Sequence, residues 1–194
     1  AAFLNPRTGL LTGFSRPPDR TSRPEWMEPD LRTTGRRPTT AIVLHTADGG
    51  ETWNHRLLPK FGQILRVRAF VDSTPLLLVQ HPDSLLAASE ILAFDPKTFS
   101  TKTIYTDKNH WLTDLALLSP ERLLAVAIDQ EGRTTPSPAI PSRVKVLQSS
   151  DLRRWTEMPV DYRAEAYRGM LAVVDSANAW LATDTGMILS LVRD

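Results

Sequence analysis

The chain has 194 residues, a formal net charge of +1 and no cysteine. The small net charge creates no global field toward nucleic acid or an anionic membrane surface, and the lack of cysteine excludes disulfides and thiolate metal ligands. Apolar runs all fall short of the roughly 20 residues that cross a bilayer. We therefore expect one domain with a substantial core, without a transmembrane segment of its own and without a nucleic-acid partner.

A short motif recurs four times along the chain: an apolar strand, a polar turn of about four residues and a second apolar strand. Each copy is followed by a third apolar strand, and the first three copies also have a second tight turn and a fourth strand. The copies occupy residues 3–11, 70–78, 117–125 and 173–181, and their third strands occupy residues 41–44, 90–94, 144–147 and 187–191.

Four-stranded units in series are typical of propeller blades. We predict an all-β fold made of β-propeller blades of four antiparallel strands, with about four blades and an incomplete last blade. Residues 1–194 then form a single propeller or part of one, and we expect the strand that would complete the last blade to be missing. An ordinary β-sandwich is the alternative, but the fourfold repetition of the motif favours the propeller.

The most complete turn signal is Thr-x-Asp-x-Gly-x-Thr-Trp at residues 46–53. The Asp48 carboxylate can accept N–H groups of its own turn, Gly50 can adopt a positive φ, and we expect Trp53 to carry its ring into a core. A carboxylate used in this way is not free for catalysis, so we assign this turn and its counterpart in the third unit to architecture. The structural residues are Thr46, Asp48, Gly50, Thr52, Trp53, Ser149, Asp151 and Trp155.

Residues 46–53 resemble the Asp-box of the BNR-repeat β-propellers, a superfamily that also includes the sialidases. The units that start at Phe3 and Val173 are similar to the repeat of the photosystem II stability/assembly factor branch. The resemblance is specific at residues 41–53, whereas the second and third units match mainly in pattern. It implies a non-catalytic protein outside the cytoplasm, in a periplasm, in a lumen or secreted, that binds membrane complexes or their subunits.

Because successive strands of such a fold run in opposite directions, alternate loops lie on opposite faces. The first-to-second and third-to-fourth turns are short and share the face of Asp48. The long segments share the opposite face, where we expect binding because long loops without internal structure commonly carry function. These segments are a long Arg/Pro-rich insertion at 14–40, a second insertion at 128–142, the loop 81–89 and the inter-blade connections 60–63, 106–111 and 161–169.

The insertion at 14–40 contains six arginines, four acidic residues and five prolines. It is either a solvated loop of mixed charge or a proline-stiffened arm that wraps a partner, with arginine and tryptophan as anchors. The four acidic residues oppose the arginines and disfavour a polyanion as ligand. Together with the nearby connections, this face supplies the predicted partner-binding residues Arg20, Arg23, Trp26, Arg32, Arg36, Arg37, His110, Trp111, Tyr162, Tyr167 and Arg168.

Motifs for catalysis or metal binding are lacking in the sequence. The four histidines show no ligand spacing, and neither a phosphate loop nor a nucleophile elbow is present, so we predict no metal, no cofactor and no enzymatic activity. The predicted function is to bind or scaffold a larger protein complex outside the cytoplasm, such as a photosynthetic membrane complex that it serves as an accessory or assembly subunit.

The alternative is a sialidase-like glycoside hydrolase or a glycan-binding propeller. Tyrosine, glutamate and arginine, which sialidases use, occur together at residues 161–168. The arginine-bearing element that precedes the first blade of sialidases is not present, and the other catalytic positions of that family find no match in the sequence.

Overall fold

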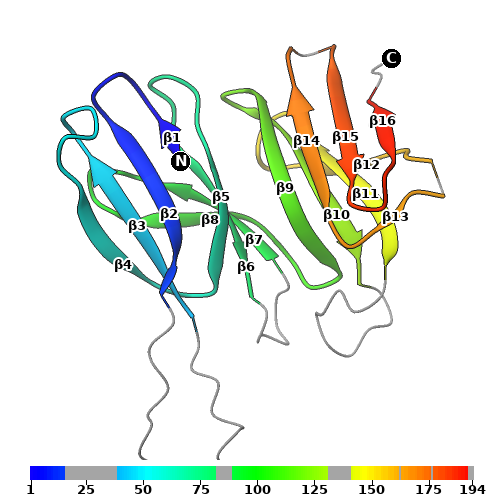
Figure 1. Cartoon of the computed structure of the whole chain (residues 1–194), viewed down its shortest axis with the longest axis horizontal. Helices are drawn as coiled ribbons and strands as arrows, with labels where there is room; N and C mark the ends of the chain where they lie inside the picture. Colours follow the sequence, from blue (N-terminus) through cyan, green and yellow to red (C-terminus); the bar gives the residue numbers. More distant parts are fainter. Residues whose placement is uncertain (16–38, 82–88, 131–140, 162, 176, 192–194) are drawn as a thin grey trace, which may run out of the picture.

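The computed structural model describes residues 1–15, 39–81, 89–130, 141–161, 163–175 and 177–191, except for the side chains of residues 59–61. All regular structure in these ranges is β-strand, arranged in four antiparallel sheets whose strands follow chain order. Figure 1 shows the sheets side by side along the longest axis of the molecule. This arrangement is that of consecutive β-propeller blades and confirms the predicted fold class.

Each sheet is a simple up-and-down meander. Blade one comprises β1 (Ala2–Phe3), β2 (Gly9–Ser15), β3 (Thr40–Thr46) and β4 (Asn54–Phe61). Blade two comprises β5 (Gln63–Arg68), β6 (Leu76–Gln80), β7 (Ser89–Phe94) and β8 (Thr101–Asp107). Blade three comprises β9 (His110–Ser119), β10 (Arg122–Asp129), β11 (Ser142–Ser149) and β12 (Trp155–Met158), with the short β13 (Glu165–Ala166) paired to β11. Blade four comprises β14 (Gly169–Val173), β15 (Ala179–Thr183) and β16 (Ile188–Ser190).

The blades pack face to face because their central strands are apolar on both sides. In β6, every residue is buried, and alternate side chains point to opposite faces of a strand. Leu77 and Val79 therefore join the core shared with blade one, whereas Leu76 and Leu78 join the core shared with blade three. A third core, between blades three and four, is built in the same way from Leu124, Val126 and Ile128 of β10 and Ala179 and Leu181 of β15.

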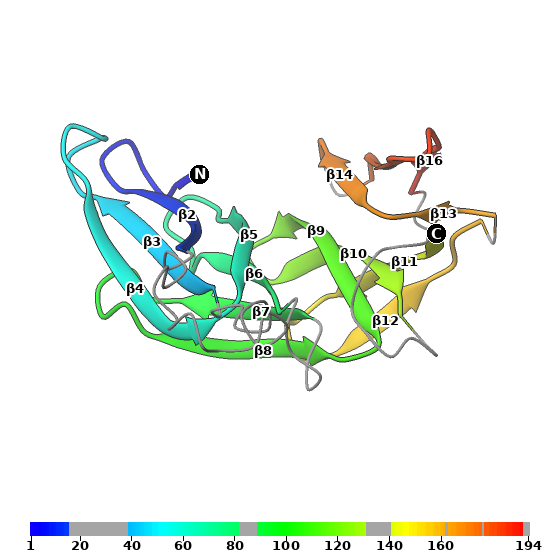
Figure 2. The same ribbon diagram turned by 60° about the horizontal axis from the view of Figure 1, so that its bottom comes forward.

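The first strands of blades two, three and four meet along the inner edge of the array. Strand β9 lies against β5 on one side and against β14 on the other. Figure 2 shows the sheets along an open arc, with blade one and blade four at opposite ends. We call the row formed by β5, β9 and β14 the axial edge.

Two strand limits in blade two differ from the sequence prediction. Its first strand is Gln63–Arg68, earlier in the chain than expected, and the expected connection at 60–63 shrinks to Gly62. Gly62 has a φ of 122°, and a Cβ there would lie 2.7 Å from the carbonyl oxygen of Gln80, so only glycine fits. Phe70 belongs to a turn instead, because the Ser73 hydroxyl bonds both its N–H and its carbonyl group.

The two predicted insertions also begin and end differently. Phe14 and Ser15 still pair with Ala41 and Thr40, so β2 and β3 take up both ends of the expected 14–40 segment. Likewise, Ile128 pairs with Val144 within the third sheet. Backbone pairing continues past the last apolar residue of each strand, because the partner strand satisfies the N–H and C=O groups there. Residues 16–38 and 131–140 lie outside the described residues.

Gly169 offers a test of the packing between blades three and four. A Cβ at this position would lie 2.5 Å from Cγ1 of Val126 and 2.9 Å from Cδ1 of Leu181. We expect Gly169→Ala to lower the free energy of unfolding by about 1–3 kcal/mol, because it overpacks this core. Urea denaturation measures the change.

Gly13→Ala is the matched control for this variant. Its Cβ would lie 3.8 Å from Cγ2 of Ile42, which is an ordinary contact. We expect a change within about 0.5 kcal/mol, as is usual for substitutions away from packed positions. Equal effects of the two substitutions would contradict the packing described here.

Candidate functional site

The turn at residues 46–53 is closed by its own side chains. Asp48 Oδ1 accepts the Thr46 hydroxyl at 2.6 Å and the Thr52 N–H at 2.9 Å, and Oδ2 accepts the Thr52 hydroxyl at 2.5 Å. The hydroxyl of Thr46 in turn accepts the Gly50 N–H at 2.9 Å. Hydrogen bonds from Thr46 and then Thr52 hold the pKa of Asp48 well below its usual range. The carboxylate is thus fully committed to the turn.

Trp53 does not enter a core, contrary to the expectation from the sequence. Its ring is half-buried and meets the ring of Phe3 edge to face at 6.5 Å. Its indole N–H donates to the carbonyl of Gly50 at 3.0 Å, which folds the ring back over its own turn. The β4 strand begins only at the next residue, so Trp53 is placed by the turn rather than by the sheet.

The counterpart turn in blade three works without glycine. The Asp151 carboxylate accepts the N–H groups of Arg153 and Arg154 at 2.9 and 2.8 Å, and the N–H groups of Arg154 and then Arg153 lower its pKa. Leu152 takes the positive φ of 57° that this turn requires. Trp155 then packs against Tyr105 of blade two, with ring centroids 4.7 Å apart.

The predicted partner-binding residues fall into two groups. Arg20, Arg23, Trp26, Arg32, Arg36, Arg37 and Tyr162 lie outside the described residues. His110, Trp111, Tyr167 and Arg168 lie at one end of β9 and β14, where Thr113 and Gly169 are joined by two hydrogen bonds. Ser15 pairs with Thr40 where β2 ends and β3 begins, at the end of the blades that lies away from the Asp48 turn. We call this end of the blades the loop end.

Trp111 is unsuitable as a contact residue. Only 7% of its surface is exposed, because β9 turns the ring into the core between blades three and four. Tyr167 is half-buried and Arg168 is exposed, and the N–H of Tyr167 donates to the Asp184 carboxylate at 3.0 Å. Of the predicted partner-binding residues that the structure describes, Tyr167, Arg168 and part of His110 are therefore accessible to solvent.

His110 belongs to a network that joins β8 to β9. Asp107 Oδ2 bonds His110 Nδ1 at 2.5 Å and accepts the Tyr105 hydroxyl at 2.6 Å, and Oδ1 accepts the Asn109 N–H at 2.6 Å. Burial alone would raise the pKa of Asp107, but the bonds from His110 and Tyr105 outweigh it and lower the value to about 2. Burial, and then Asp107, raise the pKa of Tyr105.

The axial edge carries a charged cluster that the sequence did not predict. Asp114 of β9 is 1% exposed, and its Oδ1 accepts Arg66 Nε at 3.0 Å and Arg68 Nη2 at 3.3 Å. Its oxygens also accept the N–H groups of Leu115 at 3.0 Å and Leu171 at 2.9 Å. One carboxylate thus ties together blades two, three and four, and about a third of each arginine side chain remains exposed.

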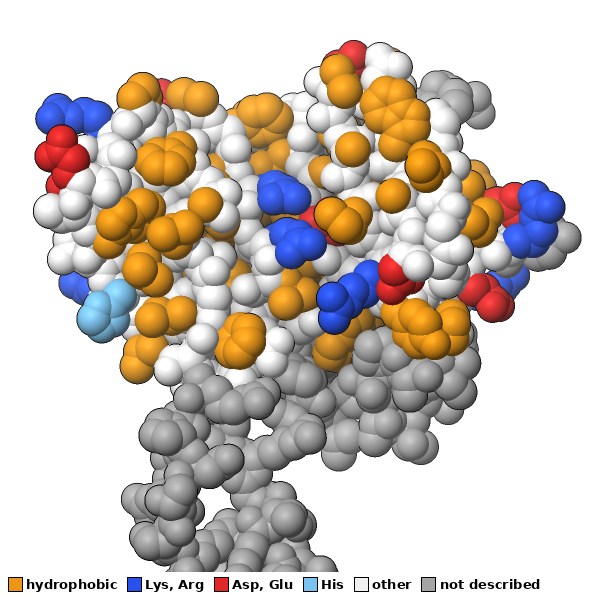
Figure 3. Space-filling model, in the orientation of Figure 1, with side chains coloured by type: hydrophobic (Ala, Val, Ile, Leu, Met, Phe, Trp, Pro, Cys, Tyr) orange, Lys and Arg blue, Asp and Glu red, His pale blue; other side chains and the backbone are white. Residues whose placement is uncertain are grey.

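Figure 3 shows basic side chains near the middle of this face, between the two halves of the molecule. A cavity of about 290 Å³ lies against Arg68, and the other side chains around it are apolar. It is lined by Arg68, Ala69, Phe70, Ala116, Leu117, Leu171 and Val173. The only signals in the sequence were an Arg-x-Arg alternation and a single acid inside an apolar run.

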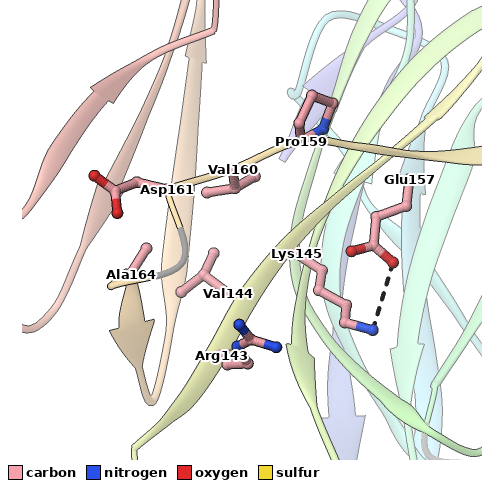
Figure 4. A pocket seen from close by; sticks show the side chains of 8 residues that line it. All are labelled: Arg143, Val144, Lys145, Glu157, Pro159, Val160, Asp161 and Ala164. Carbon is pink, nitrogen blue, oxygen red and sulfur yellow. Dashed lines mark ion pairs between the residues drawn. The ribbon is translucent and has the colours of Figure 1, made fainter.

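A second pocket, of about 160 Å³, lies on blade three beside the chain leading to β13 (Figure 4). Lys145 contacts Glu157 at 3.4 Å and Asp129 at 3.5 Å. Burial would lower the pKa of Lys145, but Asp129 and Glu157 raise it above its ordinary value, so the amine stays protonated. At the other end of the pocket, the Asp161 carboxylate is paired with Arg163 at 2.6 Å. The protonated amine of Lys145 is not a nucleophile, and the Asp161 carboxylate is engaged by Arg163.

Within the described ranges, no group of three or more His, Asp or Glu side chains is placed to hold a metal ion. The same ranges contain no helix long and apolar enough to cross a membrane.

Fold and site together define a β-propeller array with a basic axial edge. Neither a family model nor a curated protein matches the sequence. Among solved structures, the chain is similar to one described as YCF48 bound to D1 peptide, with 12% identity and a TM-score of 0.38 over 81% of this chain and 76% of that chain. At this level the similarity carries no inference about function.

The Asp107 network predicts a pH dependence of stability. Because the pKa of Asp107 is lowered from 3.8 to about 2 in the folded state, its ionised form stabilises the fold at neutral pH. That contribution is lost as the pH falls from about 4 toward 2. We expect Asp107→Asn to lower the urea midpoint at about pH 7 and to differ less from the wild type at about pH 3.

Asp72→Asn is the control for removing one carboxylate. Asp72 is exposed and has a φ of 53°, a conformation that asparagine tolerates. A gap between Asp107→Asn and the wild type that stays constant with pH would contradict the role given to this carboxylate.

Proposed function

We propose that this chain is a non-catalytic, protein-binding β-propeller that docks on a larger protein complex outside the cytoplasm. We further propose that it serves as an accessory or assembly subunit of a photosynthetic membrane complex. The observation that carries the binding function is the Arg66–Asp114–Arg68 cluster beside an apolar cavity at the axial edge. The resemblance of residues 41–53 to the Asp-box of the assembly-factor branch supports the finer assignment.

The charges of the axial cluster do not cancel. Two guanidinium groups face one carboxylate, and that carboxylate also accepts two backbone N–H groups. The cluster therefore retains one positive charge, with part of both arginines open to solvent. Arginine favours carboxylate ligands because its planar N–H groups match their geometry. A peptide segment with a carboxylate next to an apolar side chain fits this charge and the adjoining cavity.

Four of the described aspartates are used for structure, which supports a function without catalysis. Asp48, Asp95, Asp151 and Asp175 accept hydrogen bonds within their own turns, which lower their pKa values. A glycoside hydrolase needs a carboxylic acid that stays protonated near neutral pH. Turnover of a fluorogenic sialoside that Glu165→Gln abolishes would overturn the proposal in favour of the sialidase-like alternative.

Peptide binding tests the axial site directly. The probe is a fluorescein-labelled peptide, Gly-Ser-Leu-Ala-Leu-Asp-Leu, with a free carboxyl terminus. Its control is the C-terminal amide with asparagine in place of aspartate. We expect fluorescence anisotropy to show at least about tenfold weaker binding of the neutral peptide, because each charge-assisted hydrogen bond contributes about 1.5–3 kcal/mol.

Arg66→Gln and Arg68→Gln should each weaken binding of the acidic peptide about tenfold. Each leaves Asp114 one arginine and both backbone N–H partners, so the fold persists. Arg153→Gln, in the exposed part of the Asp151 turn, removes the same charge and should have no effect. Equal binding of the two peptides, or equal loss in all three variants, would contradict the axial site.

The arginine- and proline-rich segment can be tested separately. Because Ser15 and Thr40 pair across β2 and β3, a short Gly-Ser linker can replace residues 18–36 without breaking the sheet. We expect the thermal midpoint to stay the same while less of the chain co-migrates with its native complex on a native gel. Unfolding of the shortened chain would show that the segment belongs to the core.

A further inference from the structure

A cavity of about 550 Å³ lies between blades one and two, at the end of the blades that carries the Asp48 turn. Its walls come from the turn between β1 and β2, the end of β3, the turn between β5 and β6 and the turn between β7 and β8. It shares no lining residue with the cavity at the axial edge. Sites for small molecules have volumes of roughly 300–1,000 Å³, so a compact organic ligand fits this one.

The walls of this cavity are fixed by hydrogen bonds within and between the turns. The N–H of Leu4 donates to the carbonyl of Thr8, and the N–H of Thr8 donates to Oδ1 of Asn5, both at 2.8 Å. The N–H of Asp72 donates to the carbonyl of Leu4 at 3.1 Å, which joins a turn of blade two to a turn of blade one. A preformed cavity of this kind loses little conformational entropy on binding.

An aromatic ring forms part of the cavity wall. Phe99 has a φ of 57°, which is rare for a bulky residue. Its ring meets the rings of Phe94 and His45 edge to face at 5.7 and 5.9 Å, and the guanidinium of Arg56 lies 4.5 Å from its centre. These contacts hold the ring beside Pro96 on the lining. Such a wall favours a flat aromatic ligand, because ring-to-ring contacts contribute beyond the burial of surface.

The polar groups around the cavity favour an anion. The ammonium of Lys97 has no ion-pair partner among the described residues, since Asp95 of the same turn accepts the Thr98 hydroxyl at 2.8 Å instead. Asn5 uses its Oδ1 to close its own turn, which leaves its amide N–H groups to donate. Asp72 is the only acid among the described lining residues, and it is exposed, so water screens its charge.

We propose that this cavity binds a small aromatic carboxylate. The ring of the ligand packs against Phe99 and Pro96, and its carboxylate accepts hydrogen bonds from Lys97 and Asn5. Bonds from an ammonium to a carboxylate are stronger than bonds between neutral groups, so the charge on the ligand provides the selectivity. The site is separate from the axial edge, and either site can fail its test without the other.

Three compounds with the same skeleton and different charge test the proposal on the whole chain. Phenylpropionate is the anion, phenylpropionamide is the neutral form and phenylpropylamine is the cation, and ligand-observed NMR titration measures their dissociation constants. We expect phenylpropionate to bind at least about fivefold more tightly than phenylpropionamide, because it forms a charge-assisted hydrogen bond. Phenylpropylamine should bind no better than the amide.

Variants then locate the bound compound. Lys97→Gln should lower the affinity for phenylpropionate to that of the amide, and Ala47→Trp, on the lining, should abolish binding by filling the cavity. Asp72→Asn should increase the affinity about twofold, because it removes a screened negative charge. Lys102→Gln is the matched control, since Lys102 is exposed in β8 and is not on the lining, and it should have no effect. All four positions are exposed, so the thermal midpoint should stay the same.

Several outcomes would overturn the proposal. Phenylpropionate that fails to bind at about 10 mM would show that the cavity has no use for this class of ligand. Equal or tighter binding of the amine would show that the charge preference is wrong. Binding that Arg68→Gln removes and Lys97→Gln leaves unchanged would place the compound at the axial edge instead.

Discussion

The whole structure depends on sheets that are apolar on both faces. An isolated four-stranded meander with one apolar face could pack against a single partner, but β6 and β10 are buried on both sides and require two. Each core is then shared by two blades, so the array is a chain of dependent layers rather than a set of separate units.

A buried carboxylate adds a polar connection to this apolar stack. Asp114 is almost fully buried, and transfer of a lone charge from water to that position would be strongly unfavourable. It is retained because two arginines of blade two and two backbone N–H groups, one of them in blade four, surround it. Such a group fixes the relative positions of three first strands. The excess charge of the two arginines then makes the same place suitable for an anionic ligand.

The tight turns at the Asp48 end of the blades are held together by their own side chains. At the end of the Asp48 turn, carboxylates are held by hydroxyl and N–H groups of their own turns, and their lowered pKa values are a sign of structural use. At the loop end, the side chains of Tyr167, Arg168 and His110 border the strands of the axial edge. At that end too a carboxylate is used for structure, because Asp107 is held by His110 and Tyr105.

The sequence by itself determined the all-β class, the recurrence of similar sheets and the two turns around Asp48 and Asp151. These features are local, because apolar runs of strand length and turn formers act within a few residues of one another. The sequence did not determine that Trp53 would cover its own turn, that Trp111 would be buried or that blade two would begin at Gln63. Those outcomes depend on neighbours distant in the chain.

Only the tertiary structure brought Arg66 and Arg68 to Asp114, nearly fifty residues away along the chain. The alternation of a strand shows which residues share a face, but it does not show which other sheet that face will meet. Partner choice between sheets depends on the order of blades around the arc. For that reason the axial cluster became visible only when the sheets were stacked.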